Sequence, residues 1–419
     1  MHDGGNGAAA GAGAAAGGNG ADGGPPAWRL EVAIVGGGPA GLATAATLKR
    51  AGIPATVLER SDRVGASWRK HYDRLHLHTV RWLSNLPGYR FSRKHGRWVS
   101  RDGVVRYLEG YARHHALDVR TGVEVRRLDR DRDAGEWVLD MPDGPIRARF
   151  VVVATGYNHT PVLPNWPGRD SFEGELVHGQ DYRNPEPYRG RDVLVVGSGN
   201  TGAEIAVDLV EGGAGRVRLA VRTPPNVLLR EANGIPGQVG GVLMRHFPAR
   251  VADALFTGAQ RLQVGDLSQY GLPRAPRGPY TQAVRDDVVP ILDVGLVEML
   301  KRGRVEVVAA LAGFEGRSAL LADGSRIEPD AVIACAGYAR GLEPLVGHLG
   351  VIGEKGRPTV SRGRTHPNAP NVFFIGYTNP ISGMFREFGI DARHIAKAIA
   401  RERGRSAAAA PRKREPVAA

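Results

Sequence analysis

Two glycine-rich segments with the same spacing suggest phosphate chemistry at two places on this chain. They read Gly36-Gly-Gly38-Pro-Ala-Gly41 and Gly197-Ser-Gly199-Asn200-Thr-Gly202. In such a pattern the first glycine allows a tight turn, the second lets a pyrophosphate approach the backbone, and the third lets a helix pack closely on a strand. The positive end of that helix faces the phosphates. The sequence therefore predicts two dinucleotide sites, with Asn200 beside the second.

The strand that follows each glycine segment ends in a residue whose charge predicts the nucleotide. Glu59 ends the expected strand 54–58, where a carboxylate accepts hydrogen bonds from a ribose hydroxyl. Arg222 ends the expected strand 216–221 at a similar offset, and a guanidinium suits a 2′-phosphate. We therefore expect a nucleotide without a 2′-phosphate in the first half, and NADPH rather than NADH in the second. A solvated arginine at a strand end is the alternative for Arg222.

Strands and helices of suitable length surround both glycine segments. Apolar runs at 31–35 and 192–196 come before them, and alanine-rich helical runs at 42–50 and 203–210 come after them. This order of strand, glycine turn, helix and second strand is the context that dinucleotide binding requires. A chance cluster of glycines in a glycine-rich chain is the alternative.

Three further apolar strands indicate how the two halves are joined. The runs 150–156 and 331–337 each end in a glycine followed by tyrosine, in the first case Gly156, and they repeat one design. A third run ends at Gly376, and the helical pattern after it, 388–400, could bring a helix end to a flavin ring. The pattern predicts an α/β protein with two dinucleotide-binding, Rossmann-like, three-layer domains, the NADPH domain being inserted into a discontinuous FAD domain.

Composition indicates where these domains begin and end. The 419 residues exceed what one hydrophobic core usually supports, so two domains are expected. Both ends of the chain are dominated by small or basic residues and are expected to be disordered. The expected segments are a Gly/Ala-rich tail at 1–27, an FAD-binding domain at 28–165 and 330–402, an NADPH-binding domain at 166–329, and a basic tail at 403–419.

The remaining composition argues against several classes of function. The net charge of +13 comes from scattered arginines, without zinc spacing or a helix-turn-helix pattern, so we expect no nucleic-acid partner. Because no apolar run is long enough for a membrane span and no signal peptide is recognisable, we expect a soluble, cytoplasmic protein with no membrane partner and no metal. The single cysteine, Cys335, excludes a CxxC disulfide relay of the thioredoxin-reductase kind.

A more specific pattern lies just before the second glycine segment. It reads Phe172-x-Gly174-x-x-x-His178-x-x-x-Tyr182. With this signature the chain resembles the class B flavin-containing monooxygenases over about residues 30–402. Baeyer–Villiger monooxygenases are similar but carry Trp at the last position, so Tyr182 favours the heteroatom-oxidising or related branches. An ordinary interdomain linker with a turn at Gly174 is the alternative.

Other stretches resemble the YUCCA subgroup, the indole-3-pyruvate monooxygenases. They are 58–61, 65–68, 72–78, 154–156 with 161–164, and 221–222 with 229–231. The resemblance implies that Arg60, Trp68 and His76 are among the FAD-binding residues. It also places His78 where many flavin-containing monooxygenases have an asparagine beside the flavin, which makes His78 the candidate catalytic residue. A core aromatic at Trp68 and half-buried strand histidines at His76 and His78 are the alternatives.

The resemblance implies an FAD-dependent monooxygenase that consumes NADPH and dioxygen. Reduced flavin would form a C4a-(hydro)peroxyflavin, which when protonated oxygenates an amine or thioether and when deprotonated attacks a carbonyl. The YUCCA pattern implies an α-keto acid such as indole-3-pyruvate, with loss of carbon dioxide. Residue spacing alone does not choose among these small substrates, and it leaves the oligomeric state open.

Two other classes of function remain open from the sequence. An NAD(P)H-flavin oxidoreductase that passes electrons to a quinone or ferredoxin would share both glycine segments, but it has no need of the signature between Phe172 and Tyr182. A redox sensor without catalytic activity would keep the glycines and lose flavin reduction. Coupling of NADPH consumption to product identifies a monooxygenase, and anaerobic bleaching of the flavin by NADPH excludes the sensor.

Overall fold

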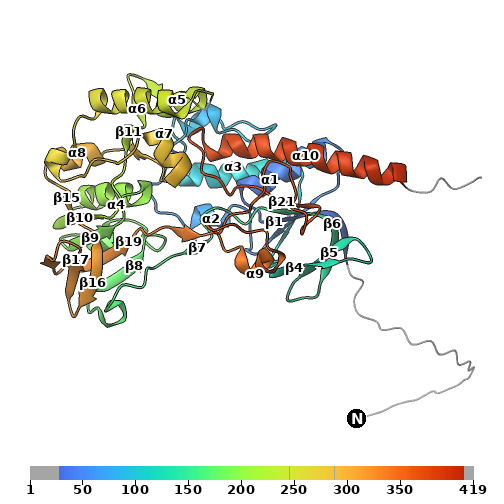
Figure 1. Ribbon diagram of the computed structural model, residues 1–419, viewed down its shortest axis with the longest axis horizontal. Coiled ribbons are helices and arrows are strands. Elements are labelled where there is room, and N and C mark those ends of the chain that lie inside the picture. The colour runs from blue at the N-terminus through green and yellow to red at the C-terminus, as the bar shows by residue number, and fades with distance from the viewer. Residues whose placement is uncertain (1–27, 245, 287, 410–419) are drawn as a thin grey trace, which may run out of the picture.

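The computed structural model describes residues 28–409 except 245 and 287. Two sheets with their helices lie side by side, the second sheet on the left and the first on the right in Figure 1. The expected α/β class with two dinucleotide-binding units is confirmed by this arrangement. The tail expected at 1–27 lies outside the described residues.

The first sheet has seven strands built around β1 and β6. Its order is β3 (Asp118–Thr121), β2 (Thr56–Glu59), β1 (Arg29–Val35), β6 (Ile146–Val153), β5 (Glu136–Asp140) and β4 (Arg127–Asp131), and β21 (Val372–Phe374) also pairs with β6. The strands β3, β2, β1, β6 and β21 are parallel neighbours, whereas β4, β5 and β6 form an antiparallel meander. Parallel neighbours need long crossover connections, which here contain the helices.

Helices connect the strands and cover the sheets (Figure 1). In the described part of the chain the α-helices are α1 (Pro39–Arg50), α2 (Ala66–Arg69), α3 (Arg101–His114), α4 (Asn200–Glu211), α5 (Gly237–Met244), α6 (Ala249–Gln263), α7 (Pro279–Thr281), α8 (Leu296–Lys301), α9 (Glu343–Val346) and α10 (Met384–Ala409).

The second sheet contains, in spatial order, β15 (Glu306–Ala309), β10 (Arg216–Val221), β9 (Asp192–Val196), β19 (Ala331–Ala334) and β8 (Glu175–His178). The smaller sheets pair β11 (Val227–Leu229) with β14 (Ile291–Asp293), β12 (Glu231–Ala232) with β13 (Ile235–Pro236), and β20 (Tyr338–Ala339) with β7 (Thr160–Pro161), and they join β16 (Leu311–Glu315), β17 (Ser318–Leu321) and β18 (Arg326–Ile327).

Alternating side chains of the first sheet are buried on both of its faces. Val32 and Ile34 of β1 pack with α1, α3 and α10. Ala33 and Val35 point to the opposite face, where they meet the meander and α9. A strand that is covered on both faces needs an almost continuous apolar run, and this is the pattern of residues 31–35.

The second sheet repeats the arrangement of the first. β9 takes the central place of β1, with β10, β15 and β19 in the places of β2, β3 and β6, and every neighbouring pair is parallel. Val193 and Val195 face α4 and α8, whereas Leu194 faces the sheet of β16, β17 and β18. The repeat expected from the runs 150–156 and 331–337 is therefore present in β6 and β19.

The chain crosses twice between the two sheets. It leaves the first sheet after β6, and the crossing strands β7 and β20 pair with each other in the middle of the molecule (Figure 1). β21 then returns to the first sheet beside β6. One expected boundary is displaced, because β19 follows residue 330 and yet pairs with β9 and β8 of the second sheet. The return crossing therefore comes after Ala334, and the limit expected between residues 165 and 166 stays a prediction.

Helix α10 corrects the expectation for the C-terminal end. The helical pattern predicts residues 388–400, but the helix begins at Met384 and continues to Ala409. Residues 403–409, expected to belong to a disordered tail, are therefore helical. Alanine and arginine are good helix formers, and they prolong a helix whose earlier turns are packed against α1. Residues 410–419 lie outside the described part of the chain.

Candidate functional site

One large cavity is lined by residues of both units. Its volume is about 1250 Å³. This exceeds the roughly 300–1,000 Å³ of a pocket for one drug-sized molecule, so the cavity has room for more than one ligand group. Gly36 and Gly38 line it from the first unit and Asn200 from the second, while α5, α6 and the start of α10 complete its wall.

The first glycine segment connects β1 to α1 with a different geometry at each glycine. Gly36 has φ +115°, a region that favours glycine, and a Cβ there would lie 2.5 Å from the Ala154 oxygen. A Cβ on Gly41 would lie 2.0 Å from the Gly36 oxygen, so this contact brings helix and strand together. Gly38 directly precedes α1, and apart from its own chain neighbours no protein atom lies within 4 Å of the place of its Cβ. Open space at a helix N-terminus fits a pyrophosphate.

The carboxylate of Glu59 is held beside this turn. It accepts hydrogen bonds from the N–H groups of Gly37 and Ser61, at 2.6 and 2.9 Å, and it is buried. Glu59 and its neighbour Arg60 both line the cavity. An ionised carboxylate has about four acceptor sites, so capacity remains for a ribose hydroxyl. These residues fit the adenosine half of FAD.

The second glycine segment repeats these dimensions. Gly197 also has φ +115°, and a Cβ there would lie 2.5 Å from the Cys335 oxygen. A Cβ on Gly202 would lie 1.9 Å from the Gly197 oxygen, whereas the space around Gly199 is open. Gly199 precedes α4 as Gly38 precedes α1. The equivalence fits a second dinucleotide with its pyrophosphate at the start of α4.

Arg222 and Asn200 take different positions around the second segment. Arg222 is exposed just after β10 and does not line the cavity, which suits contact with a phosphate at the surface of the second unit. Asn200 lines the cavity, but its amide already holds the start of β14. It donates to the Pro290 oxygen at 3.2 Å and accepts from the Leu292 N–H at 2.8 Å. Asn200 therefore shapes the wall of the site.

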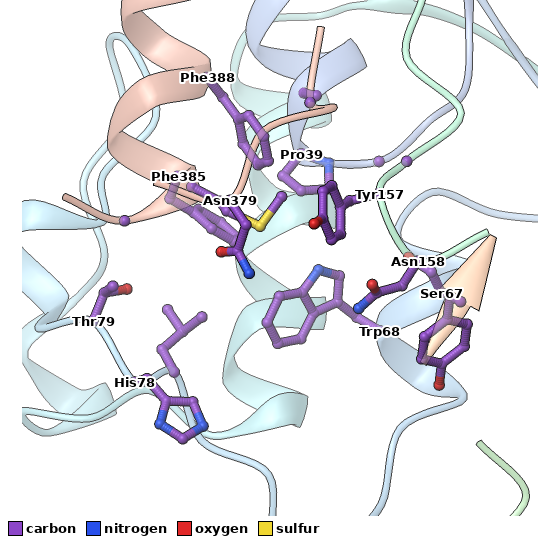
Figure 2. A pocket seen from close by; sticks show the side chains of 18 of the residues that line it. Pro39, Ser67, Trp68, His78, Thr79, Tyr157, Asn158, Asn379, Phe385 and Phe388 are labelled. Atoms are coloured by element: carbon purple, nitrogen blue, oxygen red, sulfur yellow. The ribbon is translucent and has the colours of Figure 1, made fainter. Parts of the chain in front are cut away.

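Aromatic side chains form the wall where the flavin ring is expected. Figure 2 shows Trp68 and Phe385 beside one space, with the Asn379 amide pointing into it. The rings of Trp68 and Phe385 meet edge on, with centroids 5.9 Å apart. Gly156 and Gly376 follow β6 and β21, and they line the same cavity with φ +101° and +88°. The helix end predicted to approach a flavin, the start of α10, therefore lies at the cavity.

The two candidate histidines have different surroundings. His78 lines the cavity next to Thr79, in the lower left of Figure 2. Its Nε2 lies 2.5 Å from Glu204 Oε1, and its buried Nδ1 has no hydrogen-bond partner among the described residues. His76 is exposed, its Nδ1 lies 2.7 Å from the Arg74 oxygen, and it does not line the cavity. The structure therefore does not bring His76 to the expected FAD site, because its side chain points to solvent, opposite the buried side chains of its immediate neighbours Leu75 and Leu77.

The first two signature residues, Phe172 and Gly174, contribute to packing in the second unit. Phe172 packs against Phe314, with ring centroids 4.4 Å apart. A Cβ on Gly174 would lie 2.5 Å from the Phe172 ring, so the absence of a side chain leaves room for that ring. Neither residue lines the cavity.

The other two signature residues are buried and make hydrogen bonds. His178 Nδ1 accepts from the Gln180 N–H at 3.0 Å, which leaves Nε2 to donate to the Gly337 oxygen at 3.2 Å. The Tyr182 hydroxyl donates to Asp208 of α4 at 2.8 Å. Burial lowers the pKa of His178, and burial together with the charge of Asp208 raises the pKa of Tyr182. The signature therefore stabilises the second unit from outside the cavity.

His71 is a neutral histidine on the cavity wall. Burial, reinforced by the charges of Arg183 and Arg101 and opposed by that of Glu204, lowers the pKa of His71 to about 4. Its ring packs edge on against Trp68, with centroids 5.7 Å apart. Near neutral pH the imidazole therefore carries no charge.

We expect His71 to make the folded protein less stable in acid. An unfolded histidine titrates near pH 6.5, so between about pH 6.5 and 4 the unfolded state binds more protons than the folded one. This contribution to stability is complete above that range and falls by about 2 kcal/mol between pH 7 and 5. The His71→Phe variant keeps an aromatic ring and loses this part of the pH dependence. Denaturant unfolding of both proteins at the two pH values measures it, and equal losses of stability would contradict the expectation.

Three residues at the site were not singled out from the sequence. Asn379 follows β21, and its place after the carboxyl end of a parallel strand is a usable signal. Gln238 of α5 accepts from the Val80 N–H and donates to the Ser382 oxygen, both at 2.8 Å, and so ties two walls together. Glu204 of α4 is buried against the first unit. No local pattern marks Gln238 or Glu204, because their partners are distant in the sequence.

The described residues lack three features that other functions would require: a metal site, a reactive thiol and a membrane-spanning helix. Within 28–409, apart from the two gaps, no cluster of His, Cys, Asp and Glu could hold a metal ion. Burial raises the pKa of the Cys335 thiol to about 12, so it is a poor nucleophile. None of the helices in these residues is long and apolar enough to cross a membrane.

Known proteins share these features. Residues 33–228 match a family described as pyridine nucleotide-disulphide oxidoreductase. The chain is 34% identical to indole-3-pyruvate monooxygenase YUCCA1 of Oryza sativa subsp. japonica over 387 residues, which cover 91% of this chain and 94% of the rice protein.

Solved structures share the fold. The flavin-containing monooxygenase from Stenotrophomonas maltophilia matches 90% of this chain and 99% of its own, with a TM-score of 0.68 and 24% identity. The OTEMO complex with FAD and NADP matches 90% of this chain and 86% of its own, with a TM-score of 0.67 and 17% identity. At these identities the similarity shows a common architecture.

Proposed function

Because the chain belongs to the YUCCA-type family of FAD- and NADPH-dependent flavin monooxygenases, we propose that it oxidatively decarboxylates an aromatic α-keto acid, with indole-3-pyruvate as the first candidate. The keto acid, NADPH, a proton and dioxygen are converted into the shortened acid, carbon dioxide, NADP⁺ and water. One atom of dioxygen enters the acid and the other leaves as water.

The similarity to the rice enzyme along nearly the whole of both chains carries this proposal. The cavity supports it in two ways. Trp68 and Phe385 offer an aromatic wall, against which an aromatic side chain packs favourably. Lys70 lines the same cavity and carries a positive charge that suits a substrate carboxylate. An amine or a thioether has no need of such a cation.

In this proposal the first unit holds FAD and the second holds NADPH. Gly38 and Glu59 bind the pyrophosphate and the ribose of FAD, while Gly199 and Arg222 bind the pyrophosphate and the 2′-phosphate of NADPH. Bound FAD accepts a hydride from NADPH and activates dioxygen, chemistry that no side chain of the protein supplies. The protein orients the two nucleotides and the substrate and shields them from water.

His78 is our candidate for the group that holds or moves a proton beside the reacting atoms. It lies on the cavity wall. The family resemblance aligns it with an asparagine that many related enzymes have beside the flavin, and an imidazole can exchange a proton near neutral pH. Asn379 adds a second polar group, which points into the space beside Trp68 (Figure 2). Both side chains offer polar atoms to ligands in a part of the cavity whose other walls include aromatic rings.

A product assay with matched substrates tests the proposed function. Indole-3-pyruvate and phenylpyruvate are each compared with a tertiary amine and a thioether, with NADPH, product and hydrogen peroxide all measured. We expect the keto acids to give the shortened acids in amounts close to the NADPH consumed. Product from the amine or thioether alone would refute the substrate class. Consumption of NADPH with only hydrogen peroxide formed would favour an NAD(P)H-flavin oxidoreductase instead.

A further inference from the structure

We propose that Glu204 is a positioning residue for the oxygenation: from the NADPH-binding helix α4, its carboxylate fixes the orientation and the proton of His78 across the boundary between the two units. The inference rests on the proposed function, because it concerns the histidine placed at that site. It adds a residue of the second unit to the catalytic role for which the first unit supplies His78.

Glu204 is a buried carboxylate whose partners come mostly from the other unit. It is 4% exposed, and its Oε1 lies 2.5 Å from His78 Nε2. Burial and the charge of Glu204, which also forms a hydrogen bond with the Tyr72 hydroxyl, raise the pKa of Tyr72 well above its usual range. Arg230, whose pKa is lowered by its own burial, adds a positive charge close to Glu204. Burying a carboxylate is unfavourable without such partners, so the cluster holds the Glu204 side chain in one place.

The contact with Glu204 determines which nitrogen of His78 carries a proton. An ionised carboxylate can only accept hydrogen bonds, so His78 Nε2 donates to Glu204. His78 Nδ1 is buried and has no hydrogen-bond partner in the described part of the chain. The imidazole is therefore held through one nitrogen only, and the partner of that nitrogen sets its tautomer and its angle.

The same contact joins the NADPH site to the cavity wall. Glu204 lies on α4 shortly after Gly199, the position that is open for a pyrophosphate. Tyr72 and His78 belong to one segment of the first unit, and that segment continues into Thr79 at the cavity (Figure 2). The pyrophosphate position before α4 and the cavity wall at His78 are therefore connected through one helix and one buried polar contact.

The test uses Glu204→Gln, which keeps the shape of the side chain and removes its charge. Nitrogen-15 NMR of the histidine-labelled enzyme, with FAD and NADP⁺ bound, reports the protons on each imidazole, and the His78 signals are identified by their loss in His78→Asn. We expect Glu204→Gln to change the protonation pattern of His78. Dioxygen that is not used on substrate is reduced to hydrogen peroxide by NADPH and a proton, which yields NADP⁺. We expect the peroxide formed per NADPH to rise about tenfold in Glu204→Gln.

Asp208→Asn is the matched control on the same helix. Asp208 lies about one turn beyond Glu204, and its carboxylate accepts from Tyr182 outside the cavity. This variant should leave the His78 signals unchanged and the peroxide yield within about twofold of the wild type. FAD content and the thermal midpoint show whether each variant is folded. If Glu204→Gln does not retain FAD, Tyr72→Phe removes one donor to Glu204 and should shift both readouts in the same direction.

A double variant shows whether Glu204 acts through His78. Glu204→Gln combined with His78→Asn should form no more than about twofold more peroxide than His78→Asn alone. The inference would be overturned if the increases in peroxide caused by the two substitutions multiply in the double variant. It would also be overturned if the His78 signals are unchanged in Glu204→Gln. Wild-type enzyme that forms no oxygenated product from any substrate would refute the proposed function instead, and the NMR comparison would still decide the role of Glu204.

Discussion

Replacing Gly38 by valine should give a folded protein that binds almost no FAD. Gly38 has φ −81° and ψ −178°, an extended conformation that valine adopts, and no protein atom lies within 4 Å of its Cβ position. The valine side chain instead fills the space through which a pyrophosphate reaches the start of α1. We expect the FAD content to fall from about one per chain to less than about a tenth of that. The flavin absorbance per mole of purified protein measures it.

Gly199→Val is the matched control in the second glycine segment. Gly199 has the same extended conformation, and its surroundings are also open. This variant should keep its FAD and lose NADPH binding, so that NADPH no longer bleaches the flavin without oxygen while dithionite still does. Full FAD content in Gly38→Val, or loss of FAD from Gly199→Val alone, would mean that the two nucleotides are assigned to the wrong segments.

Replacing Arg222 by serine should weaken the binding of NADPH by about 10- to 100-fold, because a charge-assisted hydrogen bond to the 2′-phosphate is lost. NADH has no such phosphate, so its apparent affinity should change little. Arg222 is exposed after the end of β10, and its replacement leaves the buried strand untouched. The Michaelis constants of NADPH and NADH, measured at one ionic strength for the wild type and the variant, give the preference for NADPH over NADH.

Arg216→Ser controls for the loss of one positive charge from the same strand. Arg216 begins β10 and pairs with Glu306 on the neighbouring strand, away from the end that carries Arg222. We expect this variant to have the NADPH to NADH preference of the wild type. If Arg222→Ser and Arg216→Ser lose the preference for NADPH to the same extent, the loss of positive charge at long range explains it and Arg222 has no specific role.

The strands and glycine turns could be predicted from the sequence because their signals are local. The expected strands 192–196 and 216–221 coincide with β9 and β10. Both are covered on two faces and therefore appear as apolar runs, and the glycines after β9 mark its end. Helix α1 begins at Pro39, earlier than the expected 42–50, because proline is favoured in the first turn of a helix. The α10 extension was missed since its alanines and arginines are equally typical of a disordered tail.

The site depends on contacts that a local pattern does not record. His78 and Glu204 are far apart in the sequence, and only the packing of the two units brings their side chains within 2.5 Å. From the sequence both His76 and His78 were expected beside the flavin, although one is exposed beside Arg74 and the other lines the cavity. The signature ending at Tyr182 was recognisable as a pattern, but only the structure shows that it lies outside the cavity.

Labelled dioxygen tests most directly whether the protein is a keto-acid monooxygenase. The enzyme is incubated with NADPH and indole-3-pyruvate under oxygen-18 gas, in the presence of catalase, because free hydrogen peroxide decarboxylates keto acids without an enzyme. Mass spectrometry counts the label in the shortened acid. The predicted result is one oxygen-18 atom in each molecule of acid, with as much acid formed as NADPH consumed. Unlabelled acid, or NADPH consumption without acid, would contradict it.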